Sequence, residues 1–328
     1  MNRWSVRLLL AVVCVLAVPQ PAPAPLVYRP GEGWTYEPVG SEGKWRRVRA
    51  KDQLQVAQEA FAKKDYRLAL KAARHLVKQW PLSDYAPEAQ YLLGRCYEAK
   101  RSDEKAFKEY QTLITKYPKY EKTDEILKRQ YDIAGRFLAG QWFRLWGVIP
   151  FFPSMDKTAD LYQKVVNNGP YSDVGVQAQM KIGTTREKQK NYVQAAKAYE
   201  VAVDRYNDRP AVAADAFYRE GIAYEKQALK AEYDQSTAGK AIATFSDFAT
   251  LYPNDARVPQ TQKIISTLKT EQARGSYQVA QFYERYRRWR GALVYYNEVL
   301  LLDPESPYAT YARQRIEELK KRTQTAAR

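Results

Sequence analysis

Cysteine and histidine, two side chains common in nucleophilic catalysis, are scarce in this chain. Its 328 residues include two cysteines, Cys14 and Cys96, and one histidine, His75. A cysteine nucleophile needs a base to activate it and hydrogen-bond donors to stabilise the charge that develops during the reaction. No pattern around Cys96 or His75 supplies these groups, so Cys96 is interpreted as a small residue of a helical core.

The sequence also gives no support for a metal site or a phosphate-binding site. Zinc sites use clusters of Cys and His, and the glycines, such as Gly169 and Gly183, are isolated rather than grouped in a phosphate-binding loop. The adjacent carboxylates Asp103 and Glu104 are expected to stand in a polar turn and to be solvated. We therefore expect no catalytic residue, no metal and no cofactor, and interpret the chain as a protein that is not an enzyme.

A pattern of alanine and proline recurs along the chain. An alanine stands twelve residues before a proline in four segments, at Ala69 and Pro81, Ala106 and Pro118, Ala241 and Pro253, and Ala292 and Pro304. The apolar residues between them recur at steps of three and four, which is helical spacing, and proline cannot continue a helix. Each segment is therefore predicted to be the second helix of a helical pair.

Small residues also recur in the preceding helices, twelve positions before three of these alanines, at Ala57, Gly94 and Ala280. Small residues allow paired helices to cross closely. The offsets match those of the tetratricopeptide repeat, which is about 34 residues long. We predict an all-α, right-handed superhelical solenoid of about six such repeats, ended by a C-terminal capping helix over residues 307–322. No alternating strand pattern is evident.

The N-terminus is not predicted to belong to this fold. Arg3 and Arg7 precede an apolar run over residues 8–18, and a Pro/Ala-rich segment follows. This is the pattern of a secretory signal sequence, here over residues 1–24. Cys14 lies inside the apolar run instead of following a small residue at its end, which argues against lipidation but leaves a lipid anchor at Cys14 open.

Three segments follow the signal sequence. Residues 25–49 lack helical periodicity and are predicted to be an extended arm, whose basic end could contact lipid head groups or an acidic partner, or simply be solvated. Two groups of repeats are then predicted, over residues 50–170 and 171–328. The net charge of +16 fits an acidic partner or a solvated surface, and no nucleic-acid-binding motif accompanies it.

Residues 139–153 interrupt the third repeat. They are largely apolar and carry one charged residue, Arg144, whereas a tetratricopeptide turn needs no such segment. We interpret them either as an insertion that contacts a membrane or a partner, or as a longer helix and loop buried on the repeats. The candidate contact residues are Trp142, Phe143, Trp146, Phe151 and Phe152.

The first helices of tetratricopeptide repeats line a concave groove that can hold a peptide or a helix. Aromatic and basic side chains in this groove could bind the apolar side chains and the terminal carboxylate of a peptide, although each position could equally be an ordinary surface residue. The residues expected to face the groove are Lys51, Leu54, Gln58 and Phe61 in the first repeat, Tyr91, Arg95 and Glu98 in the second, and Met180, Thr184 and Glu187 in the fourth.

The C-terminal part resembles a known family. The segment AIATFSDFATLYP, residues 241–253, is followed by residues 263–316, KIISTLKTEQARGSYQVAQFYERYRRWRGALVYYNEVLLLDPESPYATYARQRI. This arrangement resembles the BamD (YfiO-like) component of the outer-membrane β-barrel assembly machinery. The residues that carry the resemblance are Val279, Ala280, Phe282, Tyr283, Arg285, Arg287, Ala292, Asn297, Val299, Leu300, Pro304 and Ser306.

The resemblance implies a non-catalytic scaffold that is exported across the inner membrane and faces the periplasm at the outer membrane. Its N-terminal repeats would recognise unfolded β-barrel proteins, and its C-terminal repeats would bind the barrel-forming insertase. The residues implied in that contact are Arg285, Arg287, Arg288, Trp289 and Arg290. No nucleic acid and no small-molecule substrate is expected. The alternative is another periplasmic tetratricopeptide adaptor of the cell envelope, linked to peptidoglycan or to division.

Overall fold

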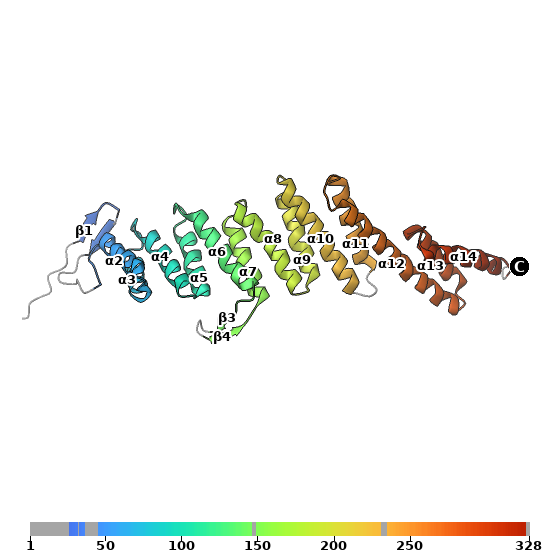
Figure 1. Ribbon diagram of the computed structural model, residues 1–328, viewed down its shortest axis with the longest axis horizontal. Coiled ribbons are helices and arrows are strands. Elements are labelled where there is room, and N and C mark those ends of the chain that lie inside the picture. Colours follow the sequence, from blue (N-terminus) through green and yellow to red (C-terminus); the bar gives the residue numbers. More distant parts are fainter. Residues whose placement is uncertain (1–25, 32, 37–44, 146–148, 231–234, 326–328) are drawn as a thin grey trace, which may run out of the picture. The chain divides into compact units, whose positions relative to one another are not determined.

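The computed structural model describes residues 26–31, 33–36, 45–145, 149–230 and 235–325 (Figure 1). This part of the chain contains 13 helices and two two-stranded sheets. The tertiary contacts divide the chain into two compact units, Met1–Thr123 and Asp124–Arg328. Successive helices pair into hairpins within each unit, so the predicted all-α, tetratricopeptide-type fold is confirmed. The predicted signal sequence, including Cys14, lies outside the described residues.

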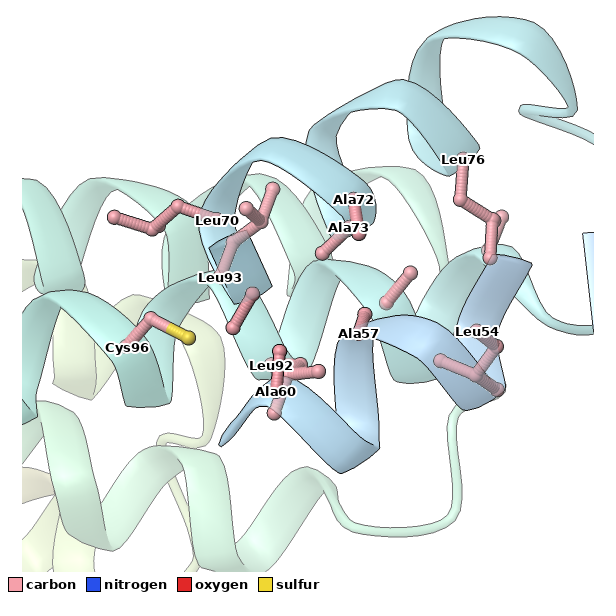
Figure 2. Packing of buried hydrophobic residues seen from close by; sticks show 13 residues of the cluster. Leu54, Ala57, Ala60, Leu70, Ala72, Ala73, Leu76, Leu92, Leu93 and Cys96 are labelled. Carbon is pink, nitrogen blue, oxygen red and sulfur yellow. The ribbon is translucent and has the colours of Figure 1, made fainter. Parts of the chain in front are cut away.

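The described part of the first unit holds two helical hairpins. Helix α2 (Ala50–Ala62) pairs with α3 (Tyr66–Gln79), and α4 (Ala86–Ala99) pairs with α5 (Asp103–Lys116). Helix α3 also contacts α4, so the second hairpin stacks on the first. Alanine and leucine side chains of α2, α3 and α4 fill the space between them, together with the buried Cys96 (Figure 2).

The second unit continues the pattern with longer helices. Its pairs are α6 (Thr123–Leu138) with α7 (Met155–Asn168), α8 (Asp173–Lys188) with α9 (Tyr192–Arg205), α10 (Pro210–Lys230) with α11 (Gln235–Leu251), and α12 (Val258–Arg285) with α13 (Trp289–Leu302). Helix α14 (Pro307–Thr325) packs on α13 and α12 and ends the stack as the predicted cap. The predicted division after residue 170 stays a prediction, and α7 and α8 on either side of it are in contact. Among the described residues, no helix is both long and apolar enough to span a membrane.

The turn inside four of the hairpins has one common backbone conformation. Lys64, Arg101, Lys190 and Arg287 have φ angles of 61°, 53°, 57° and 57°. A residue in this left-handed region ends a helix and turns the chain sharply. Each of the four follows the small residue of its first helix by seven positions, so the turn is part of the repeat.

Aromatic rings of the second helices explain the small residues of the first helices. A Cβ atom added at Gly94 would lie 2.2 Å from Cε1 of Tyr110, and one added at Gly183 would lie 2.4 Å from Cε1 of Tyr199. Atoms cannot approach so closely, and both tyrosines are fully buried. The close crossing that the sequence predicts at Gly94 is therefore confirmed.

A β-hairpin occupies part of the segment predicted to be an extended arm. Strands β1 (Leu26–Arg29) and β2 (Gly33–Tyr36) pair antiparallel. Gly31 and Gly33 have φ angles of 78° and 75°, which glycine adopts at no steric cost. The carbonyl of Gly31 accepts a hydrogen bond from the backbone N–H of Asp84 at 2.8 Å, so the hairpin is attached to the loop before α4.

A second β-hairpin stands where the sequence suggested either an exposed insertion or a longer helix and loop. Strands β3 (Phe143–Leu145) and β4 (Ile149–Phe152) pair antiparallel, with an irregularity next to Phe143. The interpretation as a longer helix and loop is therefore wrong. The sequence did not reveal these strands, because segments of three and four residues are too short to show a clear alternation.

The contact between glycine and tyrosine can be tested by adding one methyl group. Gly183→Ala is expected to lower the free energy of unfolding by about 1–3 kcal/mol, because the new Cβ overlaps the Tyr199 ring. Gly135→Ala is the matched control in the same unit, since its Cβ would meet only the Tyr162 hydroxyl, at 3.7 Å. The control is expected to be neutral or to stabilise the protein by about 0.5–1 kcal/mol. Denaturant unfolding curves measure both free energies of unfolding. A Gly183→Ala variant that is more stable than Gly135→Ala would contradict the contact.

Candidate binding surfaces

Three of the predicted groove residues come together in the first unit. The guanidinium of Arg95 lies 5.5 Å from the ring centre of Phe61 and 5.7 Å from that of Tyr91, and its Nη1 donates to the Tyr91 hydroxyl at 3.0 Å. The ammonium of Lys122 lies 5.2 Å from the Tyr91 ring. Cations over aromatic rings make a surface suited to a carboxylate next to an apolar side chain. We call Phe61, Tyr91, Arg95 and Lys122 the N-terminal cluster.

Other predicted groove residues differ in accessibility. Lys51 and Gln58 are exposed on α2, whereas Leu54 is 7% exposed and belongs to the core between α2, α3 and α4. The expectation that Leu54 faces a ligand is therefore wrong, because its side chain fills the interface between hairpins. Met180 is half-buried and packs on Val176 and Ala202.

Two glutamates predicted to face the groove accept hydrogen bonds from buried tyrosines instead of standing free. The hydroxyl of Tyr110 donates to Glu98 at 2.8 Å, and that of Tyr199 donates to Glu187 at 2.6 Å. Thr184 is 3.5 Å from the same Tyr199 hydroxyl. A buried phenol needs such an acceptor. These carboxylates therefore stabilise the helical hairpin by accepting the tyrosine hydroxyls.

The same contact recurs in the sixth repeat, where Tyr296 donates to Glu284 at 2.8 Å. In each case the glutamate stands four residues after the small residue of the first helix and twelve before the tyrosine. Two of these glutamates also form an ion pair with a basic side chain of the helix that follows the hairpin. Lys226 contacts Glu187 at 3.0 Å, and Arg315 contacts Glu284. The sequence reasoning missed this contact, although the fixed offset of Glu was visible.

The turn between α12 and α13 carries a surface of arginines and aromatic rings. Arg285, Arg287, Arg288 and Arg290 are exposed, and no ion pair joins any of them to another described residue. Phe282 and Tyr286 are 55% and 63% exposed, with ring centres 4.7 Å apart. We call these six residues the C-terminal patch. Trp289 was predicted with them, but it is half-buried against the C-terminal core, and the guanidinium of Arg322 lies 5.8 Å from its ring centre.

The β3–β4 hairpin divides the predicted contact residues between the core and the surface. Phe143 is 4% exposed and stacks on Phe137 of α6, with ring centres 4.1 Å apart. Trp142 and Phe152 are 53% and 40% exposed. Trp146 and the side chain of Phe151 lie outside the described residues. Phe143 therefore fixes the hairpin to α6, while the side chains of Trp142 and Phe152 reach the surface.

The two residues with possible nucleophilic or metal chemistry lie in apolar surroundings. Burial raises the pKa of Cys96 to about 12, which leaves its thiol protonated and unreactive at neutral pH. Burial, followed by the charges of Arg46 and Lys78, lowers the pKa of His75. Within the described ranges, no group of three or more His, Cys, Asp or Glu could hold a metal ion.

Glu220 is a buried carboxyl group in the second unit that no described side chain pairs. It is 9% exposed on α10. Burial, followed by the negative charges of Glu200 and Asp204, raises its pKa to about 7. A carboxyl whose pKa is higher in the folded than in the unfolded chain favours folding in its protonated form. Ionisation of Glu220 is therefore expected to destabilise this unit.

Models of two known families match different parts of the chain. Residues 54–121 match the model of a tetratricopeptide repeat, and residues 154–302 match the YfiO model, described as an outer membrane lipoprotein. The chain combines tetratricopeptide repeats with a YfiO-like region. The YfiO-like region runs from the start of α7 to the end of α13 and includes the C-terminal patch. Both families consist of protein-interaction scaffolds.

The chain also resembles solved structures, at low identity. The C-terminal part of a tetratricopeptide protein from Cytophaga hutchinsonii is 14% identical, with 80% of this chain and 87% of that chain covered and a TM-score of 0.35. A tetratricopeptide protein from Parabacteroides merdae is 12% identical, with 83% and 97% covered and a TM-score of 0.32. Scores this low support no inference about binding. No curated protein matches the chain.

The raised pKa of Glu220 predicts a pH-dependent effect of Glu220→Gln. At pH 8 the variant is expected to be more stable than the wild type, by up to about 3 kcal/mol, because glutamine cannot ionise. The difference should shrink as the pH falls through 7 and vanish below about 4.5. Thermal melts from pH 4 to 8 measure it, and an equal gain at all pH values would show that ionisation is not the cause.

Proposed function

We propose that this chain is a non-catalytic, periplasm-facing scaffold of the outer-membrane β-barrel assembly machinery. The observation that carries the proposal is the match of residues 154–302 to the YfiO outer membrane lipoprotein family. The scaffold binds the barrel-forming insertase through its C-terminal repeats and unfolded barrel proteins through its N-terminal repeats. A location at the outer membrane, after export across the inner membrane, is part of the same proposal.

The C-terminal patch supports the insertase contact. Four exposed arginines that form no ion pair with another described residue retain their donors for a partner, and arginine is enriched where proteins bind each other tightly. The two exposed rings beside them, Phe282 and Tyr286, add apolar area at the centre of a charged surface. Such a surface fits an acidic partner that also buries an apolar residue.

The N-terminal cluster supports the recognition of an unfolded chain. Arg95 is held between two rings, so its position is fixed before a ligand arrives and little side-chain entropy is lost on binding. A peptide that ends in an apolar residue would place its carboxylate at Arg95 and its last side chain against Phe61, whereas Lys122 already contacts Glu88 at 3.0 Å.

Charge reversal in the C-terminal patch tests the insertase contact. The wild-type chain is expected to co-purify with the insertase from detergent-solubilised envelopes of its own cell. The double variant Arg285→Glu/Arg290→Glu should reduce the recovery of insertase by roughly tenfold or more, since like charges oppose each other at an interface. Arg287 is left unchanged because its φ of 57° belongs to the turn.

Lys240→Glu, at an exposed position of α11, is the matched control and should leave the recovery unchanged. The absence of every outer-membrane component from the wild-type eluate would contradict the proposal. Recovery of a different envelope protein, such as one that acts on peptidoglycan, would favour the alternative periplasmic adaptor.

A peptide with an apolar C-terminal residue tests the N-terminal cluster. The free carboxylate form is expected to bind more tightly than the C-terminal amide, by roughly tenfold, since a charged hydrogen bond is lost in the amide. Arg95→Gln should remove the difference, whereas Arg67→Gln, at an exposed position of α3, should keep it. Fluorescence anisotropy measures both affinities, and equal binding of the two peptides by the wild type would exclude carboxylate recognition.

A further inference from the structure

A pocket of about 270 Å³ lies between α10, α11 and α12 of the second unit. Leu229, Ile264 and Leu268 give it apolar walls, and Glu225 is among its lining residues. Two further charged residues line it, Glu271 and Arg274. They contact each other at 2.7 Å, so their charges largely cancel.

Helix α12, which lines one side of the pocket, begins earlier relative to its small residue than α4 and α8 do. Helix α4 begins eight residues before its small residue Gly94, and α8 begins ten residues before Gly183. Helix α12 begins 22 residues before Ala280. Its N-terminal extension carries Ile264 and Leu268, and no equivalent extension is present in α4 or α8.

Glu225 occupies the position of the glutamates that accept a tyrosine hydroxyl in other repeats. It stands four residues after Gly221, as Glu187 stands four residues after Gly183. The ring that lies against Gly221 belongs to Phe245, whose Cε1 would be 2.5 Å from an added Cβ, close to the 2.4 Å found for Tyr199 at Gly183. The ring is thus in the same place, but phenylalanine has no hydroxyl to donate.

No other described group replaces that hydroxyl. Glu225 has neither a hydrogen bond nor an ion pair to any described residue. The ammonium of the next residue, Lys226, contacts Glu187 at 3.0 Å. Burial raises the pKa of Glu225, although the charge of Lys226 acts in the opposite direction. A half-buried carboxyl group in a pocket is therefore left without a donor.

We propose that this pocket binds a basic side chain, arginine or lysine, of a partner protein. The charged end reaches Glu225 and takes the place of the missing tyrosine hydroxyl. The aliphatic stem lies against Leu229, Ile264 and Leu268, because long basic side chains pack their methylene groups on apolar surface. The inference that the occupant is a protein rests on the scaffold function proposed above. The preference for a basic group rests on the residues of the pocket and is independent of that function.

Charge complementarity favours this occupant. A desolvated carboxylate gains most from a charged donor that can also hydrogen-bond to it. The chain as a whole has a net charge of +16, so most of its surface repels a basic segment. The pocket therefore selects an isolated basic residue with apolar neighbours and excludes a run of basic residues.

A titration with small probes tests the site directly. N-acetyl-arginine amide is expected to bind the full chain, and N-acetyl-citrulline amide, which has nearly the same shape but no charge, is expected to bind at least roughly tenfold more weakly. Ligand-observed NMR measures both. Equal binding of the two probes, or no binding of the arginine probe at millimolar concentration, would overturn the proposal.

Three variants place the binding at the pocket. Glu225→Gln should abolish the preference for arginine over citrulline, and Asp247→Asn, at an exposed position of α11, should preserve it. Phe245→Tyr should supply the hydroxyl to Glu225, raise the melting temperature and weaken the arginine probe severalfold. A preference that survives both Glu225→Gln and Phe245→Tyr would overturn the proposal.

The insertase contact and the basic side-chain pocket can be disproved independently of each other. The variant Arg285→Glu/Arg290→Glu tests the insertase contact and should leave binding of the arginine probe unchanged. A wild-type chain that recovers no insertase but still prefers arginine over citrulline would disprove the proposed function while retaining the pocket.

Discussion

The architecture depends on the contact between an aromatic ring of one helix and the backbone of its partner at a residue with little or no side chain. At Gly94 and Gly183 the ring fills the space that a Cβ atom would need. This close approach buries the ring completely and brings the tyrosine hydroxyl out of water. A buried hydroxyl must find an acceptor, and the glutamate one helical turn beyond the glycine provides it. The close approach of the two helices therefore requires both a small residue for the ring and a glutamate that accepts the hydrogen bond of its hydroxyl.

This requirement also links neighbouring repeats in the second unit. The glutamates that accept from Tyr199 and Tyr296 also contact Lys226 and Arg315 of the following helix. Tyrosines at the helix ends act similarly, since Tyr206 donates to the carbonyl of Pro170 at 2.8 Å. Each repeat is thus completed by the next, which is the property that lets such repeats form an extended stack.

The proposed binding surfaces lie where this internal pairing is incomplete among the described residues. The arginines of the C-terminal patch are joined to no carboxylate among the described residues, and the exposed rings of Phe282 and Tyr286 lie outside the core. In the fifth repeat phenylalanine stands at position 245 in place of the tyrosine, and no described group donates to Glu225, which lines a pocket. A repeat protein can thus acquire a specific site by losing one structural contact, without any new catalytic or metal-binding group.

The sequence alone determined the helical hairpins, because small, aromatic and proline residues at fixed offsets are local signals that the backbone must obey. It also predicted a close helix crossing at Gly94 and indicated the arginines at the turn after α12, whereas the Tyr110 ring that fills the crossing was found only in the structure. The two β-hairpins were not predictable, since short apolar or Gly-rich segments lack a period. The burial of Leu54, the assignment of Glu98 and Glu187 to tyrosine hydroxyls, and the isolation of Glu225 were decided only by tertiary structure. Whether a polar side chain is free depends on which helix packs against it, and sequence spacing within one helix does not contain that information.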